Sequence, residues 1–142
     1  MTFENCEISN NTASYFGGAG YLDEGSSTST LTMDGTLMSD NTAAIGGGLF
    51  IEEDSVVSCT GTTSTSAGFL NNTAEIQGGA IFFYDFDNTA SIESDTCDFG
   101  TSAGGDDNSS YEGSSNDIYY YEGDRFAYGD DESFSCSNES CD

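Results

Sequence analysis

The sequence predicts an all-β chain that winds as a parallel β-helix of three to four coils, closed by an irregular C-terminal cap. One phrase, Asn-Thr-Ala followed by Gly-Gly, occurs three times, starting at Asn11, Asn41 and Asn72, which are 30 and 31 residues apart. Short apolar runs alternate with Gly, Asn, Asp and Ser, which is typical of many short strands joined by turns. A repeat of about 30 residues fits one coil of a β-helix, because a propeller blade needs about 40.

Residues in equivalent places of successive coils should stack in columns about 4.8 Å apart. We expect Asn11, Asn41 and Asn72 to form a ladder of side-chain amides that satisfies turn backbone groups. Three further columns are predicted: an inward apolar file, a second inward file, and a glycine turn. Their members are Ile8, Met38, Phe69 and Phe99 for the first file, Tyr15, Ile45 and Ile76 for the second, and Gly18, Gly48 and Gly79 for the turn.

In chain order, the apolar runs at 20–22, 30–33, 49–51, 56–59 and 80–83 are expected to be strands. Residues 60–66 and 104–110 are expected to be polar loops, and Ser102 takes the ladder position in the fourth coil. Residues 116–121 give a final strand. The predicted division is a β-helix over 1–121 and an acidic cap or tail over 122–142, since terminal coils are commonly atypical.

Charge limits the partners. The chain has 26 Asp or Glu residues, one Lys or Arg, no His, and a net charge of −25. Such a surface repels phosphate backbones and anionic lipid, so nucleic acid is excluded as a partner. The longest apolar run, 80–84, is too short to span a bilayer, and membrane insertion is therefore not expected.

Five cysteines and four glycosylation sequons, at Asn10, Asn71, Asn108 and Asn138, point to an extracellular or cell-surface location. Cys6 and Cys97 share a repeat frame, but three coils separate them, which is beyond disulfide reach. Two pairings remain open, Cys97 with Cys136 on neighbouring coils and Cys136 with Cys141 in a small loop. An odd count leaves at least one thiol free or bonded to another chain. No signal peptide is visible, and the chain starts almost inside its first repeat, as a piece of a longer protein would.

Residues 69–72 (Phe-Leu-Asn-Asn) and 78–81 (Gly-Gly-Ala-Ile) resemble the FxxN and GGAI motifs of polymorphic outer membrane protein repeats. Residues 8–11 and 38–41 are similar with the Phe replaced, and 47–50 keep only the glycines. The resemblance is good over 8–83 and weak over 97–121. It implies a right-handed parallel β-helix of the kind found on cell surfaces and in autotransporter passengers, and it implies nothing about a ligand.

The polar residues of the chain also allow a catalytic and a metal-binding interpretation. A polysaccharide lyase or hydrolase is the enzymatic alternative, yet Arg125 is the one cationic side chain and suits a structural ion pair better than a catalytic base. The acidic clusters are expected to form a solvated surface, because neither the EF-hand spacing nor the nonapeptide calcium spacing is present. The alternative is a Ca²⁺ site at Asp106, Asp107, Asp130 and Asp131. A third loop cluster, formed by Asp85, Asp87 and Asn88, offers the same kind of oxygen ligand. We therefore expect no catalytic residue and no cofactor.

The favoured function is a non-enzymatic secreted or surface structural module, a building block of an extracellular filament or appendage. Its expected partners are other copies of itself or other extracellular proteins, with glycans as a further class. The alternative is an adhesin segment that docks a host or glycan partner through loop 60–66 or 104–115.

Overall fold

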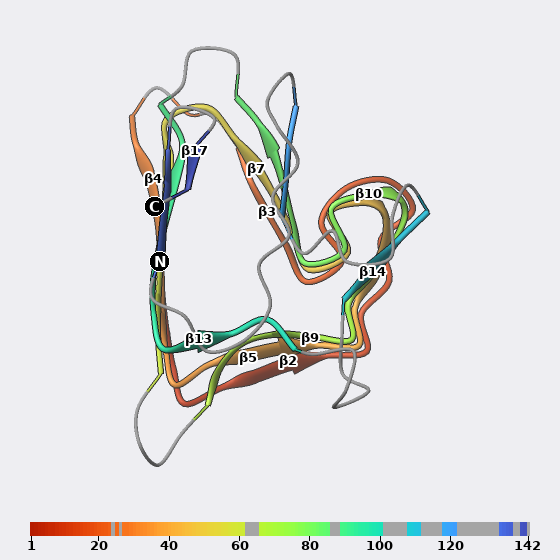
Figure 1. The fold of residues 1–142 in the computed structure, drawn as a ribbon, viewed down its shortest axis with the longest axis horizontal. Helices are drawn as coiled ribbons and strands as arrows, with labels where there is room; N and C mark the ends of the chain where they lie inside the picture. The colour runs from red at the N-terminus through yellow and green to blue at the C-terminus, as the bar shows by residue number, and fades with distance from the viewer. Residues whose placement is uncertain are drawn as a thin grey trace.

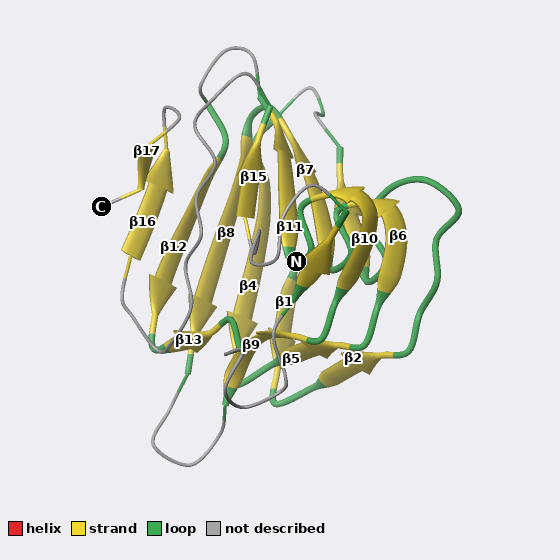
Figure 2. Cartoon of the chain, turned by 45° about the vertical axis from the view of Figure 1, so that its right-hand side comes forward, coloured by secondary structure: helices red, strands yellow, loops and turns green. Residues whose placement is uncertain are grey.

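The computed structural model confirms a parallel β-helix. It describes residues 1–23, 25, 27–61, 66–85, 89–100, 108–111, 118–121, 134–137 and 140–141 of the 142. In Figure 1 the coils lie over one another around a common interior, and Figure 2 shows their strands running side by side. Each coil contributes short strands to the sides of the helix, and corners of one to several residues connect them.

Four sheets form the sides, and we number them in the order in which a coil visits them. Sheet 1 contains β1 (Thr2–Glu4), β4 (Ser29–Asp34), β8 (Ser55–Thr60) and β12 (Ser91–Asp95). Sheet 2 contains β2 (Glu7–Ser9), β5 (Leu37–Ser39), β9 (Ala67–Leu70) and β13 (Cys97–Asp98). Sheet 3 contains β6 (Thr42–Ile45), β10 (Thr73–Gln77) and β14 (Ser109–Ser110). Sheet 4 contains β3 (Gly20–Leu22), β7 (Leu49–Glu52), β11 (Ile81–Tyr84) and β15 (Ile118–Tyr120).

The parallel stack ends in an antiparallel hairpin. β16 (Phe134–Ser137) pairs with β12 in the antiparallel sense, and β17 (Ser140–Cys141) pairs with β16 in the same way. A reversal of direction stops the regular addition of coils on sheet 1. This hairpin lies within the stretch 122–142 that the sequence assigned to a cap.

The strand register follows the repeat period. Ile8 pairs with Met38, and Met38 pairs with Phe69, so residues 30 and 31 apart lie directly over one another. Phe99 continues the file, with its ring stacked on Phe69 at a centroid distance of 5.4 Å. Met38, Phe69 and Phe99 are buried, while Ile8 at the first coil is half-buried. The inner faces of sheets 1, 2 and 4 together fill one core; its largest fully buried side chains include Leu31, Met33, Leu49, Ile51, Ile81, Phe83, Ile92 and Ile118.

The second predicted inward file is wrong. Tyr15 is 73% exposed and Ile76 is 45% exposed. The reason is the tight outward curl that the chain makes through sheet 3 (Figure 1), which has room only for small side chains on its buried side. The residues buried there are Ala43 and Ala74, the third letter of the repeated phrase, and the bulkier residues that follow face outward.

The ladder of asparagine amides runs through the core. Asn41 Nδ2 donates to Asn72 Oδ1 at 3.0 Å, and the backbone N–H of Asn41 donates to the same oxygen at 3.1 Å. Asn72 repeats the pattern toward Asn108, with both bonds at 2.9 Å. The side-chain amides also donate to backbone carbonyls of sheet 2: Asn41 Nδ2 to Ile8 and Asn72 Nδ2 to Met38, both at 2.9 Å. Asn41, Asn72 and Asn108 are each at most 1% exposed, so the ladder satisfies buried backbone groups that have no water.

The fourth rung differs from the prediction. Asn108 holds the ladder position in the fourth coil, 36 residues after Asn72 rather than about 30, and Ser102 lies outside the described residues. Asn108 Nδ2 also donates to the carbonyls of Phe69 and Phe99, at 2.6 Å each. A longer connection before the fourth rung therefore carries the chain back to the same column.

The glycine turn is also shifted by one residue in the second coil. Gly17, Gly46 and Gly78 share a left-handed backbone, with φ of 59°, 67° and 70°. The glycine that follows in each coil, Gly18, Gly47 or Gly79, packs closely against the backbone of the adjacent coil. A Cβ on Gly47 would lie only 2.4 Å from the Gly79 carbonyl oxygen. The predicted column of Gly18, Gly48 and Gly79 is therefore wrong for Gly48, which stands opposite Ala80. The cause is a register shift between β6 and β10, which makes this curl one residue shorter in the second coil.

Candidate functional site: an aromatic groove on the outer face of sheet 4

Aromatic rings form a continuous stack on the outer face of sheet 4. Alternation along each strand sends Leu49 and Ile51 inward and leaves Phe50 on the outside. The strand register places Tyr21, Phe50, Phe82 and Tyr119 in one column across four coils. Neighbouring ring centroids are 5.2, 5.3 and 5.3 Å apart, and the ring planes differ by 20°, 11° and 14°. This spacing follows from the distance between parallel strands.

A second column lies beside the first, two residues further along each strand. Glu52 pairs with Tyr84 in register, and the ring of Tyr121 lies 5.4 Å from that of Tyr84. The hydroxyl of Tyr21 donates to Oε1 of Glu52. On the opposite side, at the end of the curl of sheet 3, the ring of Phe16 lies 4.5 Å from that of Phe50. The stack is thus flanked on both sides by further aromatic rings.

These rings enclose a groove of about 420 Å³. Its lining consists of Phe16, Ile45, Phe50, Glu52, Gln77, Phe82, Tyr84 and Tyr121. Phe50 and Phe82 are only 3% exposed and are covered by their neighbours, whereas Phe16, Tyr84 and Tyr121 are 46%, 38% and 39% exposed. An exposed apolar concavity of this size is a typical interaction site.

Sequence reasoning missed this site although its signal was present. The runs at 49–51 and 80–83 are predicted as strands, but every residue in them is apolar, so their hydrophobic pattern does not distinguish an inner from an outer face. The informative feature was an aromatic residue at the same position of equivalent strands, as in Phe50 and Phe82. The misassigned second file belongs here too, because Ile45 lines the groove instead of the core.

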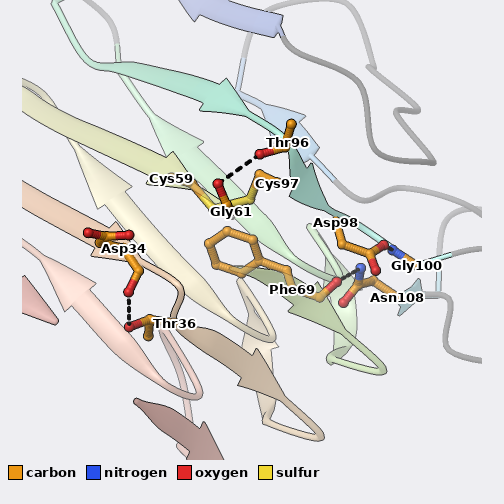
Figure 3. Close-up of a disulfide and its surroundings, with 10 residues drawn as sticks. All are labelled: Asp34, Thr36, Cys59, Gly61, Phe69, Thr96, Cys97, Asp98, Gly100 and Asn108. Carbon is orange, nitrogen blue, oxygen red and sulfur yellow. Dashed lines mark hydrogen bonds between the residues drawn. A yellow bond between two sulfur atoms is a disulfide. The ribbon is translucent and has the colours of Figure 1, made fainter. Parts of the chain in front are cut away.

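The disulfide connects two sheets of the core. Cys97 bonds to Cys59, with an S–S distance of 2.06 Å and a Cα–Cα distance of 5.7 Å, and Figure 3 shows Phe69 beside the bridge. The pairing of Cys97 with Cys136 is therefore wrong: Cys97 begins β13 in sheet 2, and Cys59 approaches it from β8 in sheet 1. The register of β16 and β17 pairs Cys136 with Cys141, and a bond between them stays a prediction. Cys6 is an exposed free thiol.

The sequons fall into three groups. Asn10 and Asn71 are exposed, with φ of 59° and 54°, and Asp40 has the same left-handed turn at 56° in the coil between them. Glycosylation at these two positions stays a prediction. Asn108 is buried with its amide nitrogen bonded to two carbonyls, so its assignment as a glycosylation site is wrong for the folded chain. Asn138 lies outside the described residues.

The predicted calcium ligands Asp106, Asp107, Asp130 and Asp131 lie outside the described residues, as does Arg125. Within the described part of the chain, no group of three or more Asp, Glu, Cys or His side chains is placed to hold a metal ion. Asp85 has a local role instead: its carboxylate accepts hydrogen bonds from the backbone N–H groups of Thr89 and Ala90, at 3.0 and 2.9 Å. Most of the two loops proposed for an adhesin, 60–66 and 104–115, also lies outside the description.

Residues 5–23 and 69–84 match the model of the Chlamydia polymorphic membrane protein repeat. These segments hold the first and third copies of the phrase; the second, whose glycine turn is displaced, is not matched. No curated protein and no solved structure matches the chain. In the part of the chain that the structure describes, no helix has the length and apolar content needed to cross a bilayer. The predicted resemblance to polymorphic outer membrane protein repeats is thus confirmed, and it is carried by these two segments of a parallel β-helix.

Proposed function

We propose that this chain is a non-enzymatic structural module of a cell surface or secreted appendage, and that its coils are building blocks of a longer rod. The match to a membrane protein repeat supports a location at the outer membrane or cell surface. The sequence lacks His, the usual general base, and has a single Lys or Arg to serve as the basic residue of a lyase, which supports a non-enzymatic role.

The observation that carries this proposal is the continuous stack of backbone and side-chain ladders. From β1 to β15 the strands of all four sheets pair in parallel, and the buried amides of Asn41, Asn72 and Asn108 connect three coils in series. In this chain the first coil ends three of the sheets with β1, β2 and β3, so it offers strand edges to which another coil can add. Half-buried Ile8 and Phe3 lie at that end of the core.

End-to-end stacking can be tested with one charge at the end of the stack. Ile8→Lys places an ammonium group where a further coil would bury it, while in an isolated molecule the long side chain can still reach water. Ile76→Lys, on an exposed side position, is the matched control. We expect light scattering and negative-stain images of the wild type and of Ile76→Lys to show elongated assemblies that Ile8→Lys lacks. A wild type that stays monomeric at every concentration would refute the building-block role.

The aromatic groove favours the adhesin segment as a second candidate. A structural spacer has no need of an apolar concavity on its flank, whereas a docking surface does. Isolated particles that bind cells, with binding lost when groove residues are changed, would support the adhesin over the filament.

A further inference from the structure

We propose that the aromatic groove on sheet 4 binds the Arg and Lys side chains of a basic polypeptide segment from a partner protein. This inference rests on the groove itself and holds whether the module is a filament subunit or an adhesin.

The exposed rings at the border of the groove, rather than the stacked rings beneath them, supply the first component of such a site. A cation is attracted to the negative face of an aromatic ring within about 6 Å of its centroid, and guanidinium groups also stack on rings. The groove is bordered by the rings of Phe16, Tyr84 and Tyr121 around the buried pair Phe50 and Phe82. A long cationic side chain entering it would cover its aliphatic stem with these rings and would keep its charged head near the rim.

A carboxylate supplies the second component. Glu52 lines the groove, and Glu53 and Asp54 follow it directly in the turn after β7. The Tyr21 hydroxyl donates a hydrogen bond to Oε1 of Glu52. A carboxylate offers about four acceptor positions, so this bond is compatible with an incoming guanidinium. A charge-assisted bond to Glu52 together with ring contacts would distinguish a cationic side chain from a neutral one.

Charge identifies the occupant. With a net charge of −25, the protein repels acidic proteins and nucleic acid and attracts basic partners over long range. A second copy of this chain is a poor source of the cation, because Arg125 is its single Lys or Arg residue. The partner must therefore be a different polypeptide that carries Arg or Lys in an accessible segment.

The test compares a short Gly/Ser peptide that carries two Arg residues with the same peptide in which citrulline, a neutral analogue of nearly equal shape, replaces each Arg. Binding to the full chain is measured by fluorescence polarisation at low and at physiological salt. We expect the citrulline peptide to bind about tenfold more weakly, as loss of a partly desolvated cation–π contact and an ion pair implies. Equal binding of the two peptides would overturn the proposal.

Variants separate the groove from general electrostatic attraction. Glu52→Gln and Tyr84→Ala should each weaken the Arg peptide several-fold. The matched controls are Glu93→Gln, an exposed acid on β12 of sheet 1, and Tyr111→Ala, a ring that is 87% exposed and outside the groove lining. Both controls should bind like the wild type. If all four variants bind equally, the attraction is non-specific and the site does not exist.

A second readout does not depend on the stability of the variants. Aromatic NMR signals of Phe50 and Phe82 in the wild type should shift when the Arg peptide is added, and the citrulline peptide should need about tenfold more peptide to give the same shift. Shifts confined to other surfaces, or produced equally by a neutral oligosaccharide, would contradict a cation site.

Discussion

Replacing Asn72 by Ala should remove the central rung of the amide ladder. Asn72 is fully buried, its Oδ1 accepts two hydrogen bonds from Asn41, and its Nδ2 donates to the Met38 carbonyl. The substitution leaves three groups without these partners: the backbone N–H of Asn41, an Nδ2 hydrogen of Asn41 and the carbonyl of Met38. Each buried group left unsatisfied costs about 1–3 kcal/mol, so the free energy of unfolding should fall by about 4 kcal/mol.

Asn11→Ala is the matched control for this prediction. Asn11 is exposed at the first coil, and its amide nitrogen donates to Ser9 and to Asn41. Because water can replace these bonds, the loss should be about 1 kcal/mol. Urea denaturation followed by far-UV circular dichroism measures both variants, with an unchanged m value as evidence that the same surface unfolds. Equal costs for Asn72→Ala and Asn11→Ala would refute the claim that the buried amides hold the coils together.

Three further predictions follow from single contacts. The double variant Cys59→Ala/Cys97→Ala opens a cross-link across 38 residues and should cost about 4 kcal/mol of unfolding free energy in urea titrations, whereas Cys6→Ser should cost almost nothing. Gly47→Ala brings a Cβ to 2.4 Å from the Gly79 carbonyl oxygen and should lower the free energy of unfolding by about 3 kcal/mol or prevent folding. Gly25→Ala is the control, because its Cβ would have its nearest contact at 3.3 Å and should change the free energy of unfolding little. Similar urea midpoints for the two variants would contradict the close crossing of the glycines. Expression in glycosylating cells should give no glycan on Asn108 in peptide mass spectra, and a modified Asn108 in folded protein would show that the fourth rung is misplaced.

The fold could be predicted because a parallel β-helix repeats its geometry at every coil. Ile8, Met38 and Phe69 occupy one column, so their spacing in the sequence is also their order in space. The same reasoning failed where the connection changes length. Ser102 fits the period of about 30 residues, but the chain continues to Asn108 before it returns to the ladder. Periodicity alone cannot place a rung that follows a long loop.

Contacts across corners were not predictable from columns either. Cys59 is in register with Ser94, and Cys97 is in register with Ala67, so neither column pairs the two sulfurs. They meet because the corner from sheet 1 to sheet 2 brings the end of β8 in one coil near the start of β13 in the next. Finding this pair requires the angle between two sheets, which the repeat period does not contain.

The candidate groove depends on two features that hold the backbone of each coil in register, the amide ladder and the crossing glycines. The amide ladder fixes the chain before the curl of sheet 3, and the crossing glycines fix it afterwards. Between these anchors the second coil is one residue shorter, from Asn41 to Gly46 instead of from Asn72 to Gly78, and the register shift between β6 and β10 absorbs the difference. A one-residue slip that continued into sheet 4 would exchange the two faces of β7 and send Phe50 into the core. The close glycine crossing stops the slip, so the residues that hold the coils together also keep the aromatic rings of successive coils aligned on the surface.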